Sequence, residues 1–262
     1  MSTTLIAPRS TLRDFRPAAH PQGHAHAPYG LPVVDHCATC KLRGASFFCS
    51  LSEPSVRALD QIKHVSAYPE GAIIFLEGEV ARGVYVLCQG RAKLLTTNSD
   101  GKTLILKIAQ PGEVLGLNAV LAGTPHEITV ETLQPCQLAF VSRDDFLRFI
   151  KEHSDACLRF AQHLGRDCHS AYDVIRSIGL SSSASEKLAR FLMEYSASGR
   201  MTDGVVRVKL ALTHEEIAQR IGCSRETVSR TLSDFKRKRL LELSGATLLV
   251  HDPAGLQTLA AS

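Results

Sequence analysis

Hydrophobic residues follow three different patterns along this chain. From about residue 53 to 142, short runs rich in β-branched and aromatic residues alternate with glycines, as strands joined by turns do. These runs are Ala72–Leu76, Gly83–Cys88, Ala92–Thr96, Leu104–Ile108 and Gln137–Val141. Many short strands separated by glycine turns predict a double-sheet jelly roll or a barrel.

A long helical stretch follows, from Arg143 to about Ile178. Its seam of small and apolar residues recurs every three or four positions, as in a coiled coil. The seam consists of Cys157, Ala161, Leu164, Cys168, Ala171, Ile175 and Ile178. One long helix with a narrow apolar seam needs a partner, so we expect a homodimer. Packing of the seam against the β-domain of its own chain is the alternative.

Two short helices around Gly222 form the third pattern. Thr213 and Glu216 have the spacing of a capping box, which satisfies free amides at a helix start. Gly222 suits a tight turn, and Ser224 is a natural N-cap for the second helix. This layout predicts a helix-turn-helix, whose second helix enters the DNA major groove.

The second helix has one apolar face and one polar face. Val228, Leu232 and Phe235 recur at i, i+4 and i+7 and are expected to face the core. The residues that we expect at the DNA are Ser224, Arg225, Glu226, Thr227, Ser229 and Arg230. Arginine can form two hydrogen bonds with guanine, and glutamate can accept one from cytosine. The alternative is a charged, solvated helix face with no partner.

Flanking segments complete a winged version of this motif. Residues 205–210 predict a strand before the two helices, and 244–250 predict the hairpin of a wing. Residues 214–240 contain seven lysines and arginines and four acids, a balance of +3, while the whole chain carries +4. Positive charge concentrated at the motif favours contact with DNA phosphates.

Composition narrows the remaining possibilities. A chain of 262 residues suits two domains. Its apolar runs are too short to span a membrane, and Met1–Pro17 has no signal-peptide core, so we expect a cytoplasmic protein. The eight cysteines are then expected to be reduced or metal-bound rather than paired in disulfides. We find no phosphate-binding loop, nucleophile elbow or metalloprotease motif, so we expect no enzyme.

Several motifs together resemble the CRP/FNR family, the superfamily of the cyclic-AMP receptor protein and the fumarate-nitrate reduction regulator. They are Gly71–Gly78, Gly83–Tyr85 with Gly90, Pro111–Gly116 and Gly222–Arg230, and the resemblance covers about residues 37–251. It implies an α+β fold: a β-roll like that of cyclic-nucleotide-binding domains, a long dimerisation helix and a winged helix-turn-helix. It also implies a homodimer on palindromic double-stranded DNA with a TGA half-site core, and RNA polymerase as a partner.

The resemblance and the patterns together divide the chain into four parts. We expect a disordered tail over 1–34, since prolines interrupt it and no periodicity is present. A cysteine-bearing segment and the β-roll occupy 35–142, and the dimerisation helix occupies 143–179. The winged helix-turn-helix then occupies 180–262.

The signal that such a roll senses is a separate question. In the cyclic-AMP branch an arginine binds the nucleotide phosphate from a loop that corresponds here to Gly123–Thr129. This loop has no arginine, and Glu127 would repel an anion. The ribose-binding glutamate of that branch corresponds to Leu117. We therefore do not expect a cyclic nucleotide.

Cysteines offer another site. Cys37, Cys40 and Cys49 precede the roll, and Cys136 lies on a later strand. Four thiolates can hold a [4Fe–4S] cluster. The resemblance to the oxygen-sensing branch implies this set, and hence a response to oxygen or nitric oxide. The spacing departs from that branch: eight residues separate Cys40 from Cys49, where five are usual.

Other uses of these cysteines stay open. They could hold structural zinc, form a redox-sensing disulfide, or bind no metal while a small effector carries the signal. Heme is a further family option, with His126 or Cys88 as ligands that no local pattern selects. From another functional class, an iron–sulfur electron-transfer protein would need the cysteines but no recognition helix.

Overall fold

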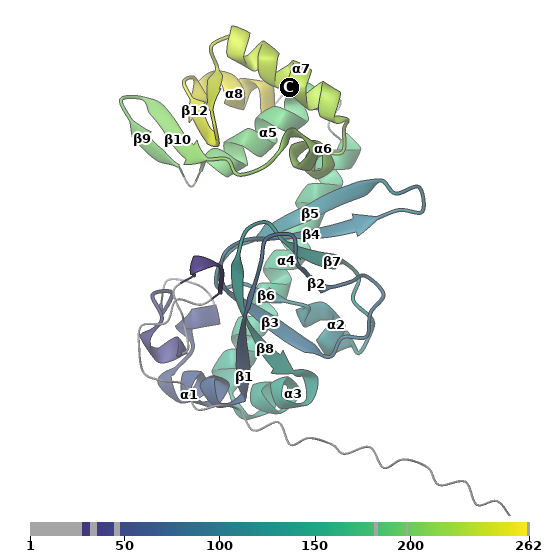
Figure 1. The fold of residues 1–262 in the computed structure, drawn as a ribbon, viewed down its shortest axis with the longest axis vertical. Coiled ribbons are helices and arrows are strands. Elements are labelled where there is room, and N and C mark those ends of the chain that lie inside the picture. Colours follow the sequence, from purple (N-terminus) through teal and green to yellow (C-terminus); the bar gives the residue numbers. More distant parts are fainter. Residues whose placement is uncertain (1–27, 32–35, 45–47, 181–182, 198, 261–262) are drawn as a thin grey trace, which may run out of the picture.

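A computed structural model of the chain describes residues 28–31, 36–44, 48–180, 183–197 and 199–260. It contains a β-roll, a long helix and a C-terminal domain in chain order (Figure 1). Most of the predicted tail over 1–34 lies outside the described residues; within it, Pro28–Gly30 forms a short 3-10 turn, η1. No helix of the described part is long and apolar enough to cross a membrane.

Two antiparallel four-stranded sheets form the roll. One has the order β1 (Lys63–Tyr68), β8 (Cys136–Ser142), β3 (Gly83–Gln89) and β6 (Val114–Leu115). The other has the order β2 (Ile73–Phe75), β7 (Thr129–Thr132), β4 (Ala92–Thr97) and β5 (Thr103–Ala109). The five predicted strands correspond to β2, β3, β4, β5 and β8. The sequence pattern missed β1, β6 and β7, which are short or poor in apolar residues.

Alternation along β3 and β8 gives the roll two separate cores. Leu87 and Leu138 point between the two sheets. Val84, Val86 and Val141 point to the outer face and pack with helical residues. Covering helices on that face are α1 (Glu53–Ile62), α3 (Arg143–Glu152) and α4 (Ser154–Leu180); the short α2 (Leu117–Ala122) joins the same core.

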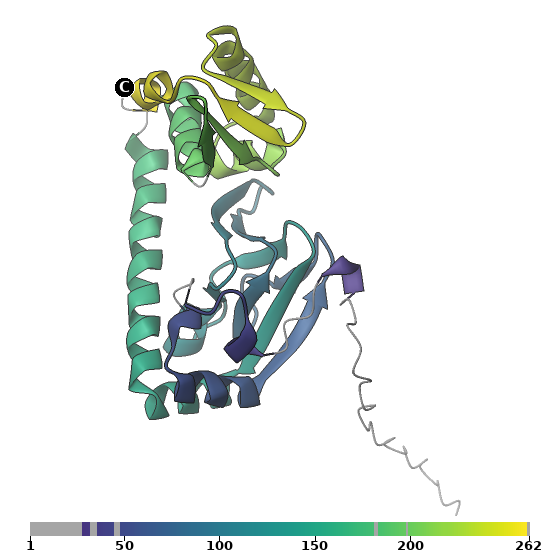
Figure 2. The same ribbon diagram turned by 90° about the vertical axis from the view of Figure 1, so that its left-hand side faces the viewer.

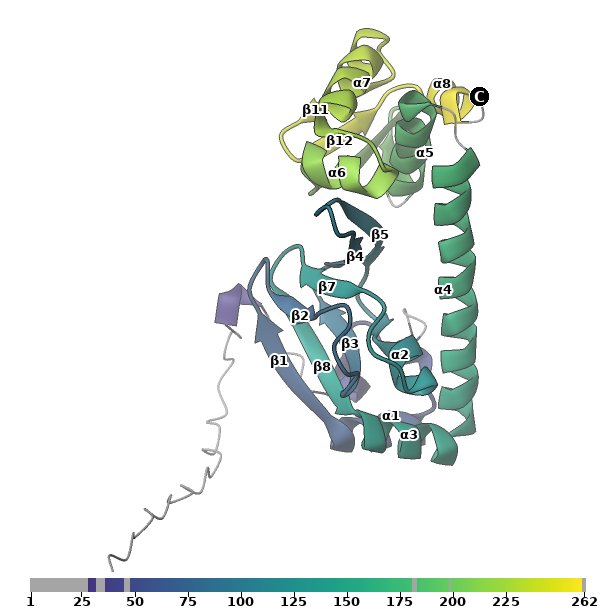
Figure 3. The same cartoon turned by 90° about the vertical axis from the view of Figure 1, so that its right-hand side faces the viewer.

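The stretch predicted as one helix over 143–179 is two helices. Ser142 caps α3 by accepting a hydrogen bond from the Asp145 amide, and α3 ends at His153, whose backbone is extended at φ −123°. Phe146 and Phe149 hold α3 against the roll. The chain then changes direction, and α4 runs along the roll to the C-terminal domain (Figures 2 and 3).

Helix α4 has two faces of different character. Ala156, Phe160 and Val174 are buried against the roll of the same chain. A second row, which we call the exposed stripe, consists of Leu158, Ala161, Gly165, Cys168, Tyr172 and Ile175. Its spacing alternates between three and four residues, so it is a heptad seam.

The exposed stripe only partly matches the predicted seam. Ala161, Cys168 and Ile175 belong to both, and Cys157 is exposed beside the stripe. Leu164, however, packs against the outer core of its own roll. Ala171 is exposed at the mouth of the roll cavity, which Ile175 also lines. The side chain of Ile178 lies outside the described part. Because one apolar edge of the helix packs against its own roll, the seam that remains exposed lies on a partly different face from the predicted one.

The C-terminal domain combines four helices with a four-stranded sheet. The helices are α5 (Ala184–Ser196), α6 (His214–Ile221), α7 (Arg225–Arg237) and α8 (Pro253–Ala260). The strands, in spatial order, are β11 (Leu241–Ser244), β12 (Thr247–Val250), β10 (Val205–Lys209) and β9 (Arg200–Thr202). The β11–β12 hairpin is the expected wing and β10 the expected strand. Between α4 and α5, Ser183 caps α5, and residues 181–182 lie outside the described part.

The β4–β5 hairpin of the roll touches this domain (Figures 1 and 3). Arg91 Nη1 donates a hydrogen bond of 2.6 Å to the Tyr195 hydroxyl. Lys93 Nζ lies 2.9 Å from Glu131 of the roll and 3.5 Å from Glu216 on α6. These contacts connect the roll directly to the first helix of the helix-turn-helix.

Candidate DNA-binding surface and ligand pockets

Both helices of the helix-turn-helix begin at side-chain caps. Thr213 Oγ1 accepts from the Glu216 amide at 3.2 Å, and Glu216 Oε2 accepts from the Thr213 amide at 2.9 Å, which completes the capping box. Gly222 ends α6 in the left-handed conformation at φ 68°. Ser224 Oγ then caps α7 by accepting from the Thr227 amide. The local sequence therefore determines where both helices start.

Helix α7 lies at the end of the molecule away from the roll (Figures 1 and 2). Val228, Leu232 and Phe235 are buried in the domain core. Arg225, Glu226 and Arg230, on the other side, are exposed. This is the arrangement that reading of a DNA groove requires.

The six predicted DNA residues have different surroundings. Ser224 and Thr227 form the cap, and Thr227 Oγ1 also accepts from Arg230 at 3.5 Å. Ser229 is half-buried and hydrogen-bonded to His214 Nδ1 at 2.9 Å, a contact between α6 and α7 that the sequence pattern did not reveal. Hydrogen bonds from its own amide and Ser224 lower the pKa of Glu226, with Arg225 and Arg230 nearby, so it is a carboxylate acceptor at neutral pH.

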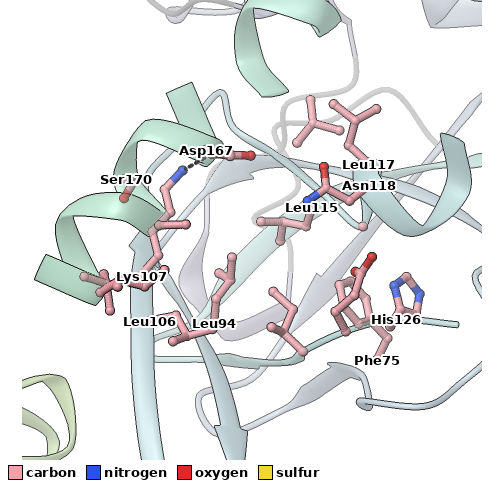
Figure 4. A pocket seen from close by; sticks show the side chains of 17 residues that line it. Phe75, Leu94, Leu106, Lys107, Leu115, Leu117, Asn118, His126, Asp167 and Ser170 are labelled. Atoms are coloured by element: carbon pink, nitrogen blue, oxygen red, sulfur yellow. Dashed lines mark hydrogen bonds and ion pairs between the residues drawn. The ribbon is translucent and has the colours of Figure 1, made fainter. Parts of the chain in front are cut away.

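A cavity of about 330 Å³ lies between the roll and α4 (Figure 4). Its wall is mostly apolar, and the larger apolar side chains in it are those of Phe75, Leu94, Leu106, Val114, Leu115, Leu117, Ile128, Val174 and Ile175. Its polar side chains are those of Lys107, Asn118, His126, Glu127, Asp167 and Ser170. The cation in the wall, Lys107, is bound to Glu113 at 2.5 Å and to Asp167 at 2.9 Å. Burial lowers the pKa of Lys107, but the two carboxylates outweigh it and raise the pKa overall. Its charge is therefore already neutralised.

His126 is the unusual polar group of this cavity. It is 4% exposed and stacks on Phe75 with ring centroids 3.8 Å apart. Burial lowers its pKa, so the ring is neutral at pH 7. Within the described part, its buried Nδ1 has no hydrogen-bond partner. The cavity suits an uncharged ligand with one hydrogen-bonding group better than an anion.

A second, smaller pocket lies on the outer face of the roll and contains cysteines. Cys37, Cys40, Cys49 and Cys88 line it, together with Leu42, Leu51, Val56, Leu59 and Lys63. Burial raises the pKa of the Cys37 thiol to about 11, although Lys63 lowers it, and raises that of Cys88 to about 12. Both are protonated at neutral pH while no metal is bound.

Cys136 does not line this pocket. Its side chain is fully buried between the sheets, and its Sγ donates to the carbonyls of Gln134 and Arg91 at 3.1 and 3.3 Å. A Cβ on Gly90 would lie 2.5 Å from this sulfur, so the site around it is filled. The predicted set of Cys37, Cys40, Cys49 and Cys136 therefore does not fit a [4Fe–4S] cluster.

The remaining thiols are near one another but not yet in ligand positions. No group of three or more His, Cys, Asp or Glu side chains in the described ranges is arranged to hold a metal ion. The void within the cysteine pocket is about 20 Å³. This is close to the space of one water molecule, far below that of four irons and four sulfides.

Comparisons with known proteins match both halves of the chain. A model described as cyclic nucleotide-binding domain matches residues 65–153, and one described as Crp-like helix-turn-helix domain matches residues 186–259. The transcriptional activatory protein AadR of Rhodopseudomonas palustris is 31% identical over 235 residues, which is 89% of this chain and 95% of the relative. A CRP-like cAMP-activated global transcriptional regulator of Mycobacterium tuberculosis is 27% identical over 80% of this chain and 94% of its own.

Solved structures share the fold. FixK2 from Bradyrhizobium japonicum has a TM-score of 0.68 at 24% identity, over 77% of this chain and 98% of its own. A CooA mutant from Carboxydothermus hydrogenoformans has a TM-score of 0.69 at 23% identity, over 80% and 92%. At these identities the likeness establishes the architecture and leaves the ligand open.

The roll cavity predicts the outcome of a titration with cyclic AMP. Since Lys107 is paired with two carboxylates, the phosphate finds no free cation, and we expect no saturable binding below about 1 mM. Isothermal titration calorimetry measures this, with the mycobacterial cAMP-activated relative as the positive control. Saturable binding in the micromolar range would contradict the assignment of the cavity to uncharged ligands.

Proposed function

Because the chain belongs to the CRP/FNR family of DNA-binding transcriptional regulators, we propose that it acts as a homodimer whose two α7 helices read a palindromic site. The domains that it contains are those of regulators, not of enzymes. The observation that carries the proposal is the capped helix α7, which exposes Arg225, Glu226 and Arg230. We expect a TGA half-site core and RNA polymerase as a partner.

Helix α4 supports the dimer. Three large side chains of the exposed stripe are more than half exposed: Leu158, Tyr172 and Ile175. Apolar side chains in a heptad seam gain free energy when a second helix covers them. A two-fold pair of α4 helices would place two recognition helices at a fixed separation, which matches two half-sites of a palindrome.

Arg230 tests the DNA-reading surface. A binding site is first selected from a random duplex library, and affinities are then measured by fluorescence anisotropy at moderate salt. Arg230→Ala is expected to lose about 1–3 kcal/mol of discrimination against a changed base pair, and Arg230→Lys to lose most of it, because lysine lacks the two-pronged donor.

Arg237→Ala is the matched control. Arg237 lies at the C-terminal end of α7 beside Asp234. Loss of a phosphate contact there would weaken specific and non-specific binding alike and leave discrimination unchanged. Unchanged discrimination in Arg230→Ala would contradict the assignment of this face to the groove.

Ile175 tests the dimer. A carboxylate in the seam of two α4 helices would be buried beside its symmetry mate, so Ile175→Glu is expected to be monomeric in sedimentation velocity. DNA affinity should fall at least about tenfold, because each monomer then binds alone. Val80→Glu, which changes another largely exposed apolar residue, on the roll, should remain dimeric. A dimeric Ile175→Glu would rule out this seam.

For the signal, we propose that DNA binding follows the metal or redox state of the cysteine pocket. The observation behind it is the gathering of four thiols from separate segments over one face of the roll. The pocket is also connected to the dimer helix. Ser52 N and Ser55 Oγ, at the start of α1, donate to Asp155 of α4 at 2.9 and 2.6 Å.

Treatment of the protein with a chelator or an oxidant tests this signal. Wild-type DNA affinity should differ at least about tenfold between reduced, metal-loaded protein and chelated or oxidised protein, a coupling typical of allosteric regulators. Cys40→Ser should give one affinity under all conditions, while Cys157→Ser, outside the pocket, should keep the response. If wild-type affinity never changes, the roll cavity with its unpartnered His126 becomes the place for the signal.

A further inference from the structure

We propose that Cys37, Cys40, Cys49 and Cys88 form a four-thiolate site for a single zinc ion, with Cys88 as the remote ligand. This deepens the proposed signal at the cysteine pocket by naming its ligands and its metal. Zinc binding itself does not depend on the effect on DNA. Cys136, the remote cysteine of the family-like pattern, is excluded from the site by its place in the sheet.

Strand alternation separates the two remote cysteines. On β3, Val84, Val86 and Cys88 point to the outer face, and Leu87 points between the sheets. On β8, Cys136 shares the inner core with Leu87. The described part of the cysteine-bearing N-terminal segment covers the outer face, so Cys88 can meet its thiols, whereas Cys136 lies across the sheet from them.

Hydrogen bonds close the long spacing between Cys40 and Cys49. The Gly44 amide donates to the Cys49 carbonyl at 3.2 Å, and the Arg43 amide donates to the Cys40 carbonyl at 2.9 Å. The Arg43 guanidinium also reaches the Cys49 and Leu51 carbonyls at 3.1 and 2.6 Å. These contacts of Arg43 and Gly44 hold Cys49 beside the segment that carries Cys40, and both thiols line the same pocket.

Two donors already point at sulfur atoms. The Leu42 amide donates to Cys40 Sγ at 3.4 Å, and Lys63 Nζ donates to Cys37 Sγ at 3.1 Å. The Lys63 side chain is only 3% exposed and is held by Asp60 at 2.6 Å, while Asp60 also accepts from the Cys37 amide. Hydrogen bonds of this kind stabilise metal-bound thiolates and orient them.

The charges favour a metal. Without a metal, the charge of the buried Lys63 side chain is balanced by Asp60, 2.6 Å away. When zinc binds, four S–H bonds break, four protons leave to solvent and four Zn–S bonds form, which leaves a site with a net charge of −2. Lys63 then lies next to the negative charge that it can stabilise.

Size selects one ion rather than a cluster. The void is about 20 Å³, and its other walls are Leu42, Leu51, Val56, Leu59 and Ala139. A tetrahedral zinc with bonds of about 2.3 Å needs the four sulfurs to converge by side-chain rotation around one point. A [4Fe–4S] cluster would need these apolar side chains to move apart.

Zinc content tests the site on the full-length protein. The wild type, Cys88→Ser, Cys88→Ala, Cys136→Ser and Cys40→Ser are purified anaerobically under reducing conditions, and zinc, iron and sulfide are assayed. Cobalt titration then reports geometry: ligand-field absorption shows a tetrahedral site, and charge-transfer intensity rises with the number of thiolates. Competition with a chelator gives zinc affinities.

The proposal requires one zinc per wild-type chain with four-thiolate cobalt spectra. Both Cys88 variants and Cys40→Ser should lose at least about 100-fold in zinc affinity, since each loses a direct ligand. Cys136→Ser should retain wild-type affinity and spectra, because its hydroxyl can keep donating to the Arg91 and Gln134 carbonyls. Circular dichroism of the metal-free proteins confirms that each variant is folded.

Three results would overturn the proposal. Zinc loss in Cys136→Ser with retention in both Cys88 variants would assign the remote ligand to Cys136. Iron and sulfide near four per wild-type chain would assign a cluster. Folded wild type that binds neither zinc nor cobalt would leave the thiols without a metal. One zinc per chain with unchanged DNA affinity on chelation would instead confirm the site and refute only its proposed role as the signal.

Discussion

The packing of α4 against its own roll is the constraint on which most of this structure depends. Phe160 and Val174 hold one face of the helix to the β-strands, and this contact closes one side of the roll cavity. It also decides which residues remain on the surface. Leu158, Tyr172 and Ile175 are left in a heptad seam because the neighbouring positions are already occupied. One helix therefore lines the roll cavity, carries the exposed stripe and leads to the helix-turn-helix domain.

Connections from the roll to the DNA-binding domain run by two routes. One follows α4 itself. The Asp155 carboxylate in its first turn accepts hydrogen bonds from Ser52 and Ser55 of the roll's N-terminal segment. The other is the β4–β5 hairpin, where Arg91 and Lys93 reach Tyr195 and Glu216. Because Glu216 is also part of the capping box of α6, this second route ends at the helix that positions α7. Polar contacts thus join the roll directly to the domain that contains α7.

The orientation of side chains in one sheet decides which remote cysteine can lie with the N-terminal thiols. Two cysteines of adjacent strands, Cys88 and Cys136, face opposite sides of the same sheet, so at most one can join the N-terminal thiols. Family-like spacing pointed to Cys136, whereas the pocket contains Cys88. Buried Lys63, which no motif drew attention to, gives the same pocket a cation that donates to sulfur.

Local physics let the sequence alone determine the helix-turn-helix, its caps at Thr213 and Ser224, its core face and most of the roll strands. Each of these depends on residues within a few positions of one another, such as the Thr213–Glu216 pair. Only the tertiary structure decided where the helix breaks at His153, which residues of α4 stay exposed, and that Ser229 bonds to His214. It also decided that Cys88, and not Cys136, lies in the cysteine pocket. These features depend on which face of an element meets a distant neighbour. Periodicity along a helix or strand shows which residues share a face, but not which distant element packs against that face.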